Sequence, residues 1–316
     1  MNIKELTHGQ PVKERFAVLS VKEKITKDGN PFLTVELSRS DGKVRATVFS
    51  EAMEHVSFKE RKVYKIQGRA QHYQGSISLL IDSADELEDE QIGQYLPQVS
   101  TLVFDIETVG ASFDDLNKAD QDYLLNSLEK GSVPKEAKQR TGLHPLYGFV
   151  AFIGMINPNS GKGRVLGLTK KSFTPANKKF KYEYFRSEAG LLKMFWQIVE
   201  EYEHIITYNG KRFDVPFLIF RSLVNKVVIP VNLNRSGSHT DLMQAIRPYG
   251  TRVYKLEAIC KALGITNPKE KGVSGLHVAK LYRNKKFQEI IDYVSRDAIS
   301  TADLYKYWRT FAPVMV

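Results

Sequence analysis

The sequence predicts an α/β protein in which a mixed sheet with flanking helices is preceded by a small all-β barrel. The first 87 residues alternate polar and apolar side chains in short strand-like runs separated by glycine-containing turns. From residue 101 onward, strand-like runs alternate with segments of helical period. A length of 316 residues suits about two domains. We therefore expect a barrel over residues 1–88, a linker over 89–100 and an α/β domain over 101–316.

Five strands and one helical connection are expected in the barrel. The turns "KDGN", "SDGK" and "YQGS" are typical hairpin loops. The segment "EAMEHVSFKER", between the third and fourth strands, is long enough for a helical turn. This order is that of an OB-fold, a barrel that commonly binds single-stranded nucleic acid. The expected strands cover residues 15–25, 31–40, 43–50, 62–73 and 76–87.

The α/β part begins with the strand "STLVFDIE" and an insert at 111–147 that is too long for a plain connection. We expect one or two short helices in this insert, which serves either as a solvated spacer or as a substrate clamp. The basic, aromatic-containing run "TKKSFTPANKKFKYEYF" is expected to be a loop. Further strands are expected at 147–156, 163–169 and 204–209, and helices at 187–202, 214–224, 254–263, 275–283 and 286–308.

The formal net charge of +10 is concentrated in the α/β part, where 32 basic residues stand against 21 acidic ones. A basic surface suits a polyanionic substrate, although a merely basic protein gives the same composition. The single cysteine, Cys260, excludes an intramolecular disulfide. The N-terminus lacks the apolar region of a signal peptide, and no run has the length of a membrane span. We therefore expect a cytoplasmic protein without a membrane partner.

Two carboxylates stand at the end of the first α/β strand, in "VFDIET". Alternate residues of a strand share a face, so Asp105 and Glu107 point the same way. Two like charges side by side are costly unless a cation holds them. The alternative is a strand edge with two solvated acids.

Two further acids follow on expected helices. Asp214, in "TYNGKRFDVPFL", opens a helix and alone would be an N-cap. Tyr293 and Asp297, in "YVSRD", are spaced i and i+4 and therefore share a helix face. Hard divalent cations prefer oxygen ligands, so the four acids together suit a site for two Mg²⁺ or Mn²⁺ ions. Asp241 also begins a helical stretch and is interpreted as a cap, with support of the site as the alternative.

The segments "FDIET", "TYNGKRFDVPFL" and "YVSRD" resemble, in this order, the three exonuclease motifs of the DEDD superfamily. The resemblance is closest to the 3′–5′ exonuclease domain of family-B DNA polymerases and covers roughly residues 100–310. "KGVSGLHVAKLY" also resembles the run that precedes the third motif there. The other subclass has a histidine five positions before the last acid; Asp292 stands there, so the tyrosine subclass fits. An RNase H-like fold is implied.

The resemblance assigns metal ligation to Asp105, Glu107, Asp214 and Asp297, and orientation of the attacking water to Tyr293. It places Asn209 and Phe213 beside the substrate strand or in the turn that they shape. Aromatic side chains hold single-stranded ends by stacking on the bases. Candidates for this contact are Tyr208, Phe213, Phe217 and Tyr254, for each of which a place in the core is the alternative.

The barrel resembles, more loosely, the small barrels that precede some bacterial exoribonucleases. Its candidates for contact with a strand are basic and aromatic: Phe32, Arg45, Phe49, Arg69, His72 and Tyr73. Because residues 1–88 hold 14 basic against 13 acidic residues, a protein partner is the alternative.

The resemblance implies a metal-dependent 3′–5′ exonuclease that degrades single-stranded nucleic acid to nucleoside monophosphates. DNA is the preferred substrate, and RNA stays open because nothing in the sequence senses a 2′-hydroxyl. No polymerase palm or fingers follows before Val316, so we expect a free-standing nuclease or one that works with a partner. The other hypothesis is an adaptor that binds nucleic acid without cleaving it.

Overall fold

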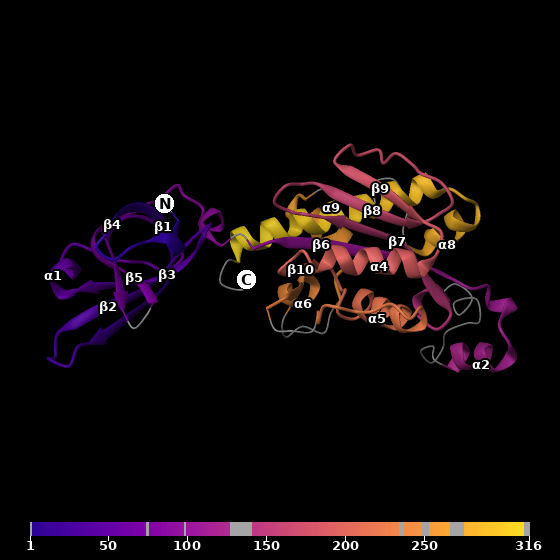
Figure 1. The fold of residues 1–316 in the computed structure, drawn as a ribbon, viewed down its shortest axis with the longest axis horizontal. Coiled ribbons are helices and arrows are strands. Elements are labelled where there is room, and N and C mark those ends of the chain that lie inside the picture. Colours follow the sequence, from indigo (N-terminus) through magenta and orange to yellow (C-terminus); the bar gives the residue numbers. More distant parts are fainter. Residues whose placement is uncertain are drawn as a thin grey trace. The chain divides into compact units, whose positions relative to one another are not determined.

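A computed structural model of the chain describes residues 2–73, 76–97, 99–126, 141–233, 237–247, 253–265 and 275–312. The chain divides into two compact units, Met1–Gln98 with Tyr307–Val316, and Val99–Lys306 (Figure 1). Each unit has its own hydrophobic core. The domain boundaries at residues 88 and 100 stay predictions. Within the described residues, no helix is both long enough and apolar enough to cross a bilayer.

The first unit holds a closed barrel of five strands in the order β1-β2-β3-β5-β4. The one-turn helix α1 (Ser50–Met53) connects β3 to β4. The predicted strands and the helical connection are confirmed. Short 3₁₀ turns stand at Ile3–Glu5 and Ile92–Tyr95. The strands are β1 (Pro11–Ile25), β2 (Pro31–Arg39), β3 (Gly42–Phe49), β4 (Val63–Tyr73) and β5 (Ser76–Leu87).

The barrel closes because its strands alternate inward and outward side chains. On β2, Val35 and Leu37 are fully buried in the core, whereas Glu36 between them is exposed. Closure also requires a glycine at position 68, where the register of β4 against β5 shifts. A Cβ at Gly68 would lie 2.1 Å from the carbonyl oxygen of Leu80, so any other residue would force the two strands apart.

The second unit is built on a six-stranded mixed sheet in the order β11-β10-β6-β7-β8-β9. Strand β6 pairs in parallel with β10 and antiparallel with β7. The hairpin β7–β8 confirms the predicted pair of strands. The strands are β6 (Thr101–Gly110), β7 (Gly148–Ile156), β8 (Gly163–Leu168), β9 (Phe180–Phe185), β10 (His204–Thr207) and β11 (His239–Asp241).

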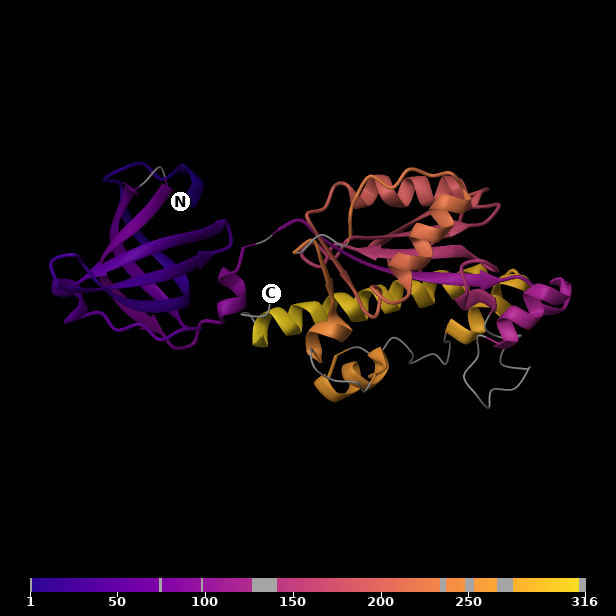
Figure 2. The same cartoon turned by 90° about the horizontal axis from the view of Figure 1, so that it is seen from below.

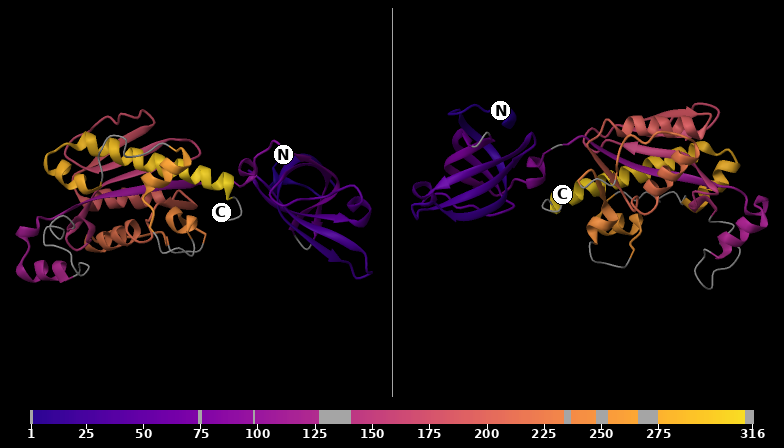
Figure 3. Two further views of the ribbon diagram at one scale, coloured as in Figure 1. Left: turned by 180° about the vertical axis from the view of Figure 1, so that it is seen from behind. Right: turned by 60° about the horizontal axis from the view of Figure 1, so that its bottom comes forward.

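Helices cover both faces of this sheet. Helix α4 (Glu188–Val199) and helix α5 (Asp214–Val224) pack on one face, and the long helix α9 (Phe287–Phe311) runs along the other (Figures 2 and 3). Ser187 caps α4 as expected, since its hydroxyl accepts a hydrogen bond from the amide of Gly190 at 3.2 Å. The smaller helices are α6 (Leu242–Ile246), α7 (Leu256–Leu263) and α8 (Gly275–Arg283).

The insert after β6 contains short helical elements, as predicted. They are the 3₁₀ turns Phe113–Asp115 and Thr141–Leu143 and the helix α2 (Lys118–Asn126). The second turn packs on the end of β6, where the Thr108 hydroxyl donates to the carbonyl of Gly142 at 2.6 Å. Residues 127–140 of the insert lie outside the described part of the chain.

Two edge strands were not predicted. Residues 180–185 were expected in a loop, which is wrong, because they form β9 and pair in parallel with β8. The segment "FKYEYF" has a short strand period of alternating aromatic and charged residues, but the basic run before it is typical of a loop, and only Phe180 of the six is buried. Strand β11 has three residues, too few for any period to show.

Candidate active site

Strand β6 carries two acids onto the face of the sheet that α9 covers. Leu102, Phe104 and Ile106 point into the core beneath α4 and α5. The alternate residues Asp105 and Glu107 therefore point to the opposite face. Glu107 is 6% exposed, and the pairing of β6 with β7 changes register immediately after it.

Helix α9 presents Tyr293 and Asp297 to these acids, and a glycine sets how closely it approaches. Asp105 pairs with Gly154 on β7, so both lie on the same face of the sheet. A Cβ at Gly154 would lie 2.7 Å from the carbonyl oxygen of Val294, inside contact distance. Backbone thus rests on backbone at this point, one residue from Tyr293. A larger residue at 154 would displace α9 and its two functional side chains.

Three carboxylates converge across these two elements. Asp105, Glu107 and Asp297 each offer an oxygen, and these oxygens all lie within 4.8 Å of one another. Burial and the nearby charges of Asp214, Asp297 and Glu107 raise the pKa of Asp105 well above its ordinary value. The three carboxylates repel one another when they are charged and no cation is bound. Their oxygens are the ligands that a hard cation prefers.

Tyr293 belongs to the same cluster. It is 4% exposed, and its hydroxyl is hydrogen-bonded to Asp297. Burial and the charges of Glu107, Asp297 and Asp105 all raise the pKa of Tyr293 far above its ordinary value. The phenol is therefore protonated and available as a hydrogen-bond donor.

The fourth acid, Asp214, lies beside the cluster in a different arrangement. It opens α5 and is 4% exposed. Its Oδ1 accepts a hydrogen bond from the amide of Ile106 at 3.0 Å, so it binds the backbone of β6 between the two strand acids. Burial raises the pKa of Asp214 to about 7, although the amides of Ile106 and of Asp214 itself oppose the rise.

The turn between β10 and α5 is held by Asp241. Its Oδ1 accepts from the amide of Asn209 at 2.9 Å and its Oδ2 from the amide of Lys211 at 3.1 Å. It also caps α6 through the amide of Met243 at 3.0 Å, so the predicted cap and the alternative of site support are both present. Asn209 has a positive φ of 66°, which identifies its position as the tight point of the turn.

The predicted stacking residues have different environments. Phe217 is 1% exposed and belongs to the core, so it cannot stack on a base. Phe213 is half-buried against it, with ring centres 5.6 Å apart. The Tyr208 hydroxyl donates to the carbonyl of Tyr254 at 2.6 Å, and Tyr254 itself is exposed.

Asp292, which stands where the other subclass has histidine, has a structural role. Its Oδ1 accepts from the amide of Ala176 and from the side chain of Gln288, both at 3.0 Å. It therefore ties the segment before β9 to helix α9.

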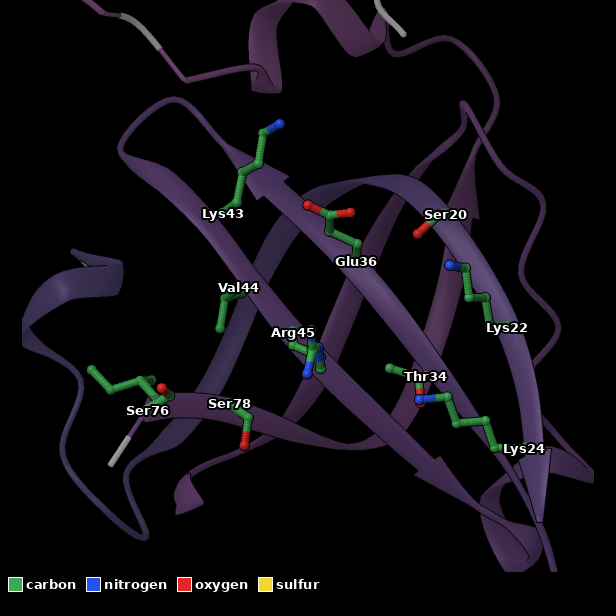
Figure 4. Close-up of a pocket in the computed structure, with 11 residues that line it drawn as sticks. Ser20, Lys22, Lys24, Thr34, Glu36, Lys43, Val44, Arg45, Ser76 and Ser78 are labelled. Atoms are coloured by element: carbon green, nitrogen blue, oxygen red, sulfur yellow. The ribbon is translucent and has the colours of Figure 1, made fainter. Parts of the chain in front are cut away.

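On the barrel, a groove of about 480 Å³ crosses the outer faces of β1, β2 and β3 (Figure 4). Lys22, Lys24, Lys43 and the predicted residue Arg45 line it. Phe32 and Phe49 lie opposite each other at the end of the paired strands β2 and β3, with ring centres 6.2 Å apart.

Three other predicted barrel residues are on β4. Arg69 and His72 are exposed there, and the His72 ring is 6.3 Å from that of His8. Neither Arg69 nor His72 lines the groove. The side chain of Tyr73, also on β4, lies outside the described part of the structure.

Comparison with known proteins shows a family model that matches part of this site. Residues 164–313 match a family model described as a predicted 3′–5′ exonuclease related to the exonuclease domain of PolB. Over these residues the chain is similar to a PolB-like 3′–5′ exonuclease domain. Asp214, Tyr293 and Asp297 lie inside the matched range, whereas Asp105 and Glu107 precede it.

Relatives of the PolB-like domain are DNA polymerases. The chain is 28% identical over 244 residues to DNA polymerase 1 of Sulfolobus acidocaldarius and 26% identical over 241 residues to that of Sulfurisphaera ohwakuensis. Both alignments cover 70% of this chain and 25% of the relative. A DNA polymerase of Pyrococcus glycovorans is 31% identical over 155 residues, which are 42% of this chain and 19% of the relative. The chain thus spans about a quarter or less of the length of these proteins.

A solved structure is also similar, that of the family B DNA polymerase from the hyperthermophilic archaeon Pyrobaculum calidifontis. It has 14% sequence identity and a TM-score of 0.46, over 93% of this chain and 46% of that one.

Sequence reasoning missed two residues that position the PolB-like site. Gly154 gave a signal, because a glycine inside an apolar strand often marks close approach of another backbone. Gly210 gave none beyond its place in a turn. A Cβ there would lie 2.4 Å from the Thr207 side chain, so only glycine fits.

Proposed function

We propose that the protein is a metal-dependent 3′–5′ exonuclease that degrades single-stranded nucleic acid, DNA in preference to RNA, to nucleoside monophosphates. The observation that carries this proposal is the convergence of Asp105, Glu107 and Asp297 within 4.8 Å, with Tyr293 hydrogen-bonded to Asp297. The match of residues 164–313, which include Tyr293 and Asp297, to a PolB-like exonuclease supports both the class of reaction and its direction.

The three converging carboxylates fit divalent metal, since they offer oxygen ligands from two rigid elements within 4.8 Å of one another. Asp105, Glu107 and Asp297 would hold Mg²⁺ or Mn²⁺, and Asp214 would complete a site for two ions. Bound metal lowers the pKa of a water molecule and stabilises the oxygen that leaves phosphorus. The residues of the chain do the rest. Tyr293 donates to Asp297 and fixes the position of the water that attacks, and Asp214 fixes the backbone of β6 through Ile106.

The single-strand preference is supported by the surroundings of the acids. The half-buried Phe213 follows the turn held by Asp241, and the exposed Tyr254 accepts a hydrogen bond from Tyr208, the residue before that turn. Stacking of a base on such rings needs an unpaired end and reads no sequence. The insert at 111–147, whose second 3₁₀ turn packs on the end of β6, is the proposed clamp on the strand.

The barrel is proposed to be an OB-fold that binds the same strand. Four cations line its groove, and Glu36 is the acid among the lining residues. The paired rings of Phe32 and Phe49 add a stacking surface on the same side of the barrel. A cationic groove beside aromatic rings is the usual design of a single-strand site.

Oligonucleotides labelled at either end test the proposal directly. With Mg²⁺ or Mn²⁺, a 5′-labelled strand should shorten one nucleotide at a time, and a 3′-labelled strand should release labelled mononucleotide at once. A matched RNA strand measures the sugar preference. Degradation from the 5′ end, or nicking of a circular strand, contradicts the proposed polarity.

The Asp297→Asn variant separates the enzyme from an adaptor. It should bind the strand in EDTA as the wild type does and lose hydrolysis with every metal. Its control is Asp303→Asn, one turn and a half further along α9, where the acid pairs with Lys306 on the surface. Strand binding without hydrolysis by the wild-type protein would favour the adaptor.

A further inference from the structure

The second unit carries a basic groove whose lining residues do not include the clustered carboxylates. It is formed by five exposed cations, Lys162, Arg164, Lys178, Lys179 and Lys181, and has a volume of about 560 Å³. Glu201 is the acidic side chain among its lining residues. The cations come from two segments, the β7–β8 turn with the start of β8, and the residues that lead into β9.

The fold brings these cations together. Strand β8 pairs in parallel with β9, and this register sets Arg164 opposite Lys181. The amide of Gly163 donates to the carbonyl of Lys179 at 3.0 Å and joins the two segments just before the strands begin. Like charges directly opposite each other destabilise a sheet, and Glu183 offsets Arg164 only through an exposed contact of 3.3 Å. The positive charge at this sheet edge therefore does not stabilise the pairing of β8 with β9.

Both turns that carry the cations are ordered by side-chain hydrogen bonds. Asn157 Oδ1 accepts from the amides of Asn159 and Ser160 at 2.9 and 3.0 Å. Asn177 Oδ1 accepts from the amide of Lys179 at 2.9 Å. The cations therefore stand on preformed turns, which lowers the entropic cost of binding an anion.

The floor of the groove is apolar. It contains Leu102, Met155 and Ile198, with the half-buried ring of Tyr202 at the end of α4. An apolar and aromatic floor beneath a cationic rim suits a nucleotide unit, with the base on the floor and the phosphates at the lysines. A partner that offers carboxylates alone would leave this floor without contact.

The groove lies on the other side of the sheet from the carboxylates. Leu102 belongs to the core beneath α4, whereas Asp105 and Glu107 cluster with Asp297 of α9. Helices α4 and α9 cover opposite faces of the sheet (Figure 2). The nucleotide held in the groove is therefore never the one at the acids. We infer that this basic groove is a second binding site for single-stranded nucleic acid, which holds the strand at a distance from its 3′ end. The inference takes the identity of the bound strand from the proposed exonuclease function. That the groove binds a polyanion follows from its own residues.

The test compares two charge-matched double variants of the full-length chain. Lys178→Ala/Lys181→Ala removes two cations of the groove. Lys170→Ala/Lys193→Ala removes two exposed lysines of the same unit that do not line it. Binding of 5′-fluorescein oligothymidylate is measured by anisotropy in EDTA over a range of salt concentrations, so that no hydrolysis interferes.

For a strand of about 20 nucleotides, the groove variant should bind at least about fivefold more weakly at low salt. The slope of log affinity against log salt should become shallower by about 1.4, since each lost phosphate contact removes about 0.7 on a single strand. The control variant should keep the slope of the wild type. Tyr202→Leu, which preserves an apolar side chain and removes the ring, should weaken binding without changing the slope.

A trinucleotide is too short to occupy both the groove and the acids. The groove variant should therefore raise KM for the long strand only, with kcat and the hydrolysis of the trinucleotide unchanged. An equal loss in the two double variants, or a wild-type salt slope in the groove variant, overturns the inference. If the wild type binds through the groove but hydrolyses nothing, the inference stands and the proposed function fails.

Discussion

The substitution Asp105→Asn should make the metal-free protein more stable while it abolishes the response to metal. The change keeps the shape of the side chain and removes one of three charges whose oxygens lie within 4.8 Å. At an effective dielectric constant of about 20, two unit charges at that distance repel each other by about 3.5 kcal/mol.

Proton uptake limits the gain. Protonating a carboxyl with an ordinary pKa of 3.8 at pH 7 costs about 4 kcal/mol. If the repulsion were larger than this, Asp105 would take up a proton instead, so the substitution cannot relieve more than about 4 kcal/mol. Allowing for imperfect packing of the amide, we expect the free energy of unfolding to rise by about 1–4 kcal/mol in EDTA. Bound metal opposes this difference, because a ligand at 100 times its Kd stabilises the wild type by about 2.7 kcal/mol.

The assay is calorimetric unfolding at pH 7, in EDTA and then in Mn²⁺ or Mg²⁺. The wild type should gain several degrees in Tm with metal, and Asp105→Asn should gain little. Asp303→Asn, on the surface of α9, should follow the wild type in both buffers. An Asp105→Asn protein that is less stable than the wild type in EDTA, or that keeps the full metal shift, refutes the reasoning.

Three further perturbations act on separate parts of the second unit. Gly154→Ala should displace α9 and lower kcat by about 10–100-fold, with little change in strand binding in EDTA. Glu188→Ala should cost about 3–5 kcal/mol in denaturant unfolding, because it leaves the largely buried Arg221 without its 2.6 Å partner. Burial lowers the pKa of His239 to about 4 from 6.5, so folding disfavours its protonation. The contribution of His239 to the free energy of unfolding is complete above pH 6.5 and decreases by about 3 kcal/mol as the pH falls towards 4. The His239→Gln variant should not show this decrease.

Each of these expectations has a contradicting result. Wild-type kcat in a normally folded Gly154→Ala protein would show that α9 is not seated on this glycine. As a control, Lys118→Ala, which breaks an exposed ion pair with Asp122, should lower the free energy of unfolding by less than about 1 kcal/mol. If Glu188→Ala costs no more than this control, the pair of Glu188 and Arg221 behaves as a surface ion pair. The histidine effect is the difference between wild type and variant at each pH. This subtraction matters because the raised pKa of Asp214 lowers stability as pH rises through the same window.

Much of the fold follows from local pattern. The strands of the barrel and helices α5 and α8 were predicted within a few residues, because their apolar periods and turn glycines act over short distances. The misses, β9 and β11, are edge strands. An edge strand is defined by hydrogen bonds to one neighbour rather than by an apolar face, so its own residues give little signal.

The site divides in the same way. Strand and helix periods fix which acids share a face on β6 and on α9. That the two faces meet was implied by the resemblance to the exonuclease motifs, and the structure brings three of the acids together. The bond from Ile106 to Asp214 joins residues 108 apart in the sequence, and no local rule predicts it. The contact between Gly154 and Val294 is of the same kind, because it depends on two backbones that meet only in the folded state.

The bond between Asp214 and the amide of Ile106 has a consequence for how such domains diverge. Strand β10 pairs with β6 only as far as Val103, and the Asp214 side chain accepts from an amide further along β6. A homologue that had abandoned hydrolysis would be free to change the residues equivalent to Asp105 and Asp297. It would still need an oxygen at 214 to hold the strand. Retention of Asp or Asn at that position alone is therefore a mark of inherited architecture, and it should not be counted as a surviving trace of activity.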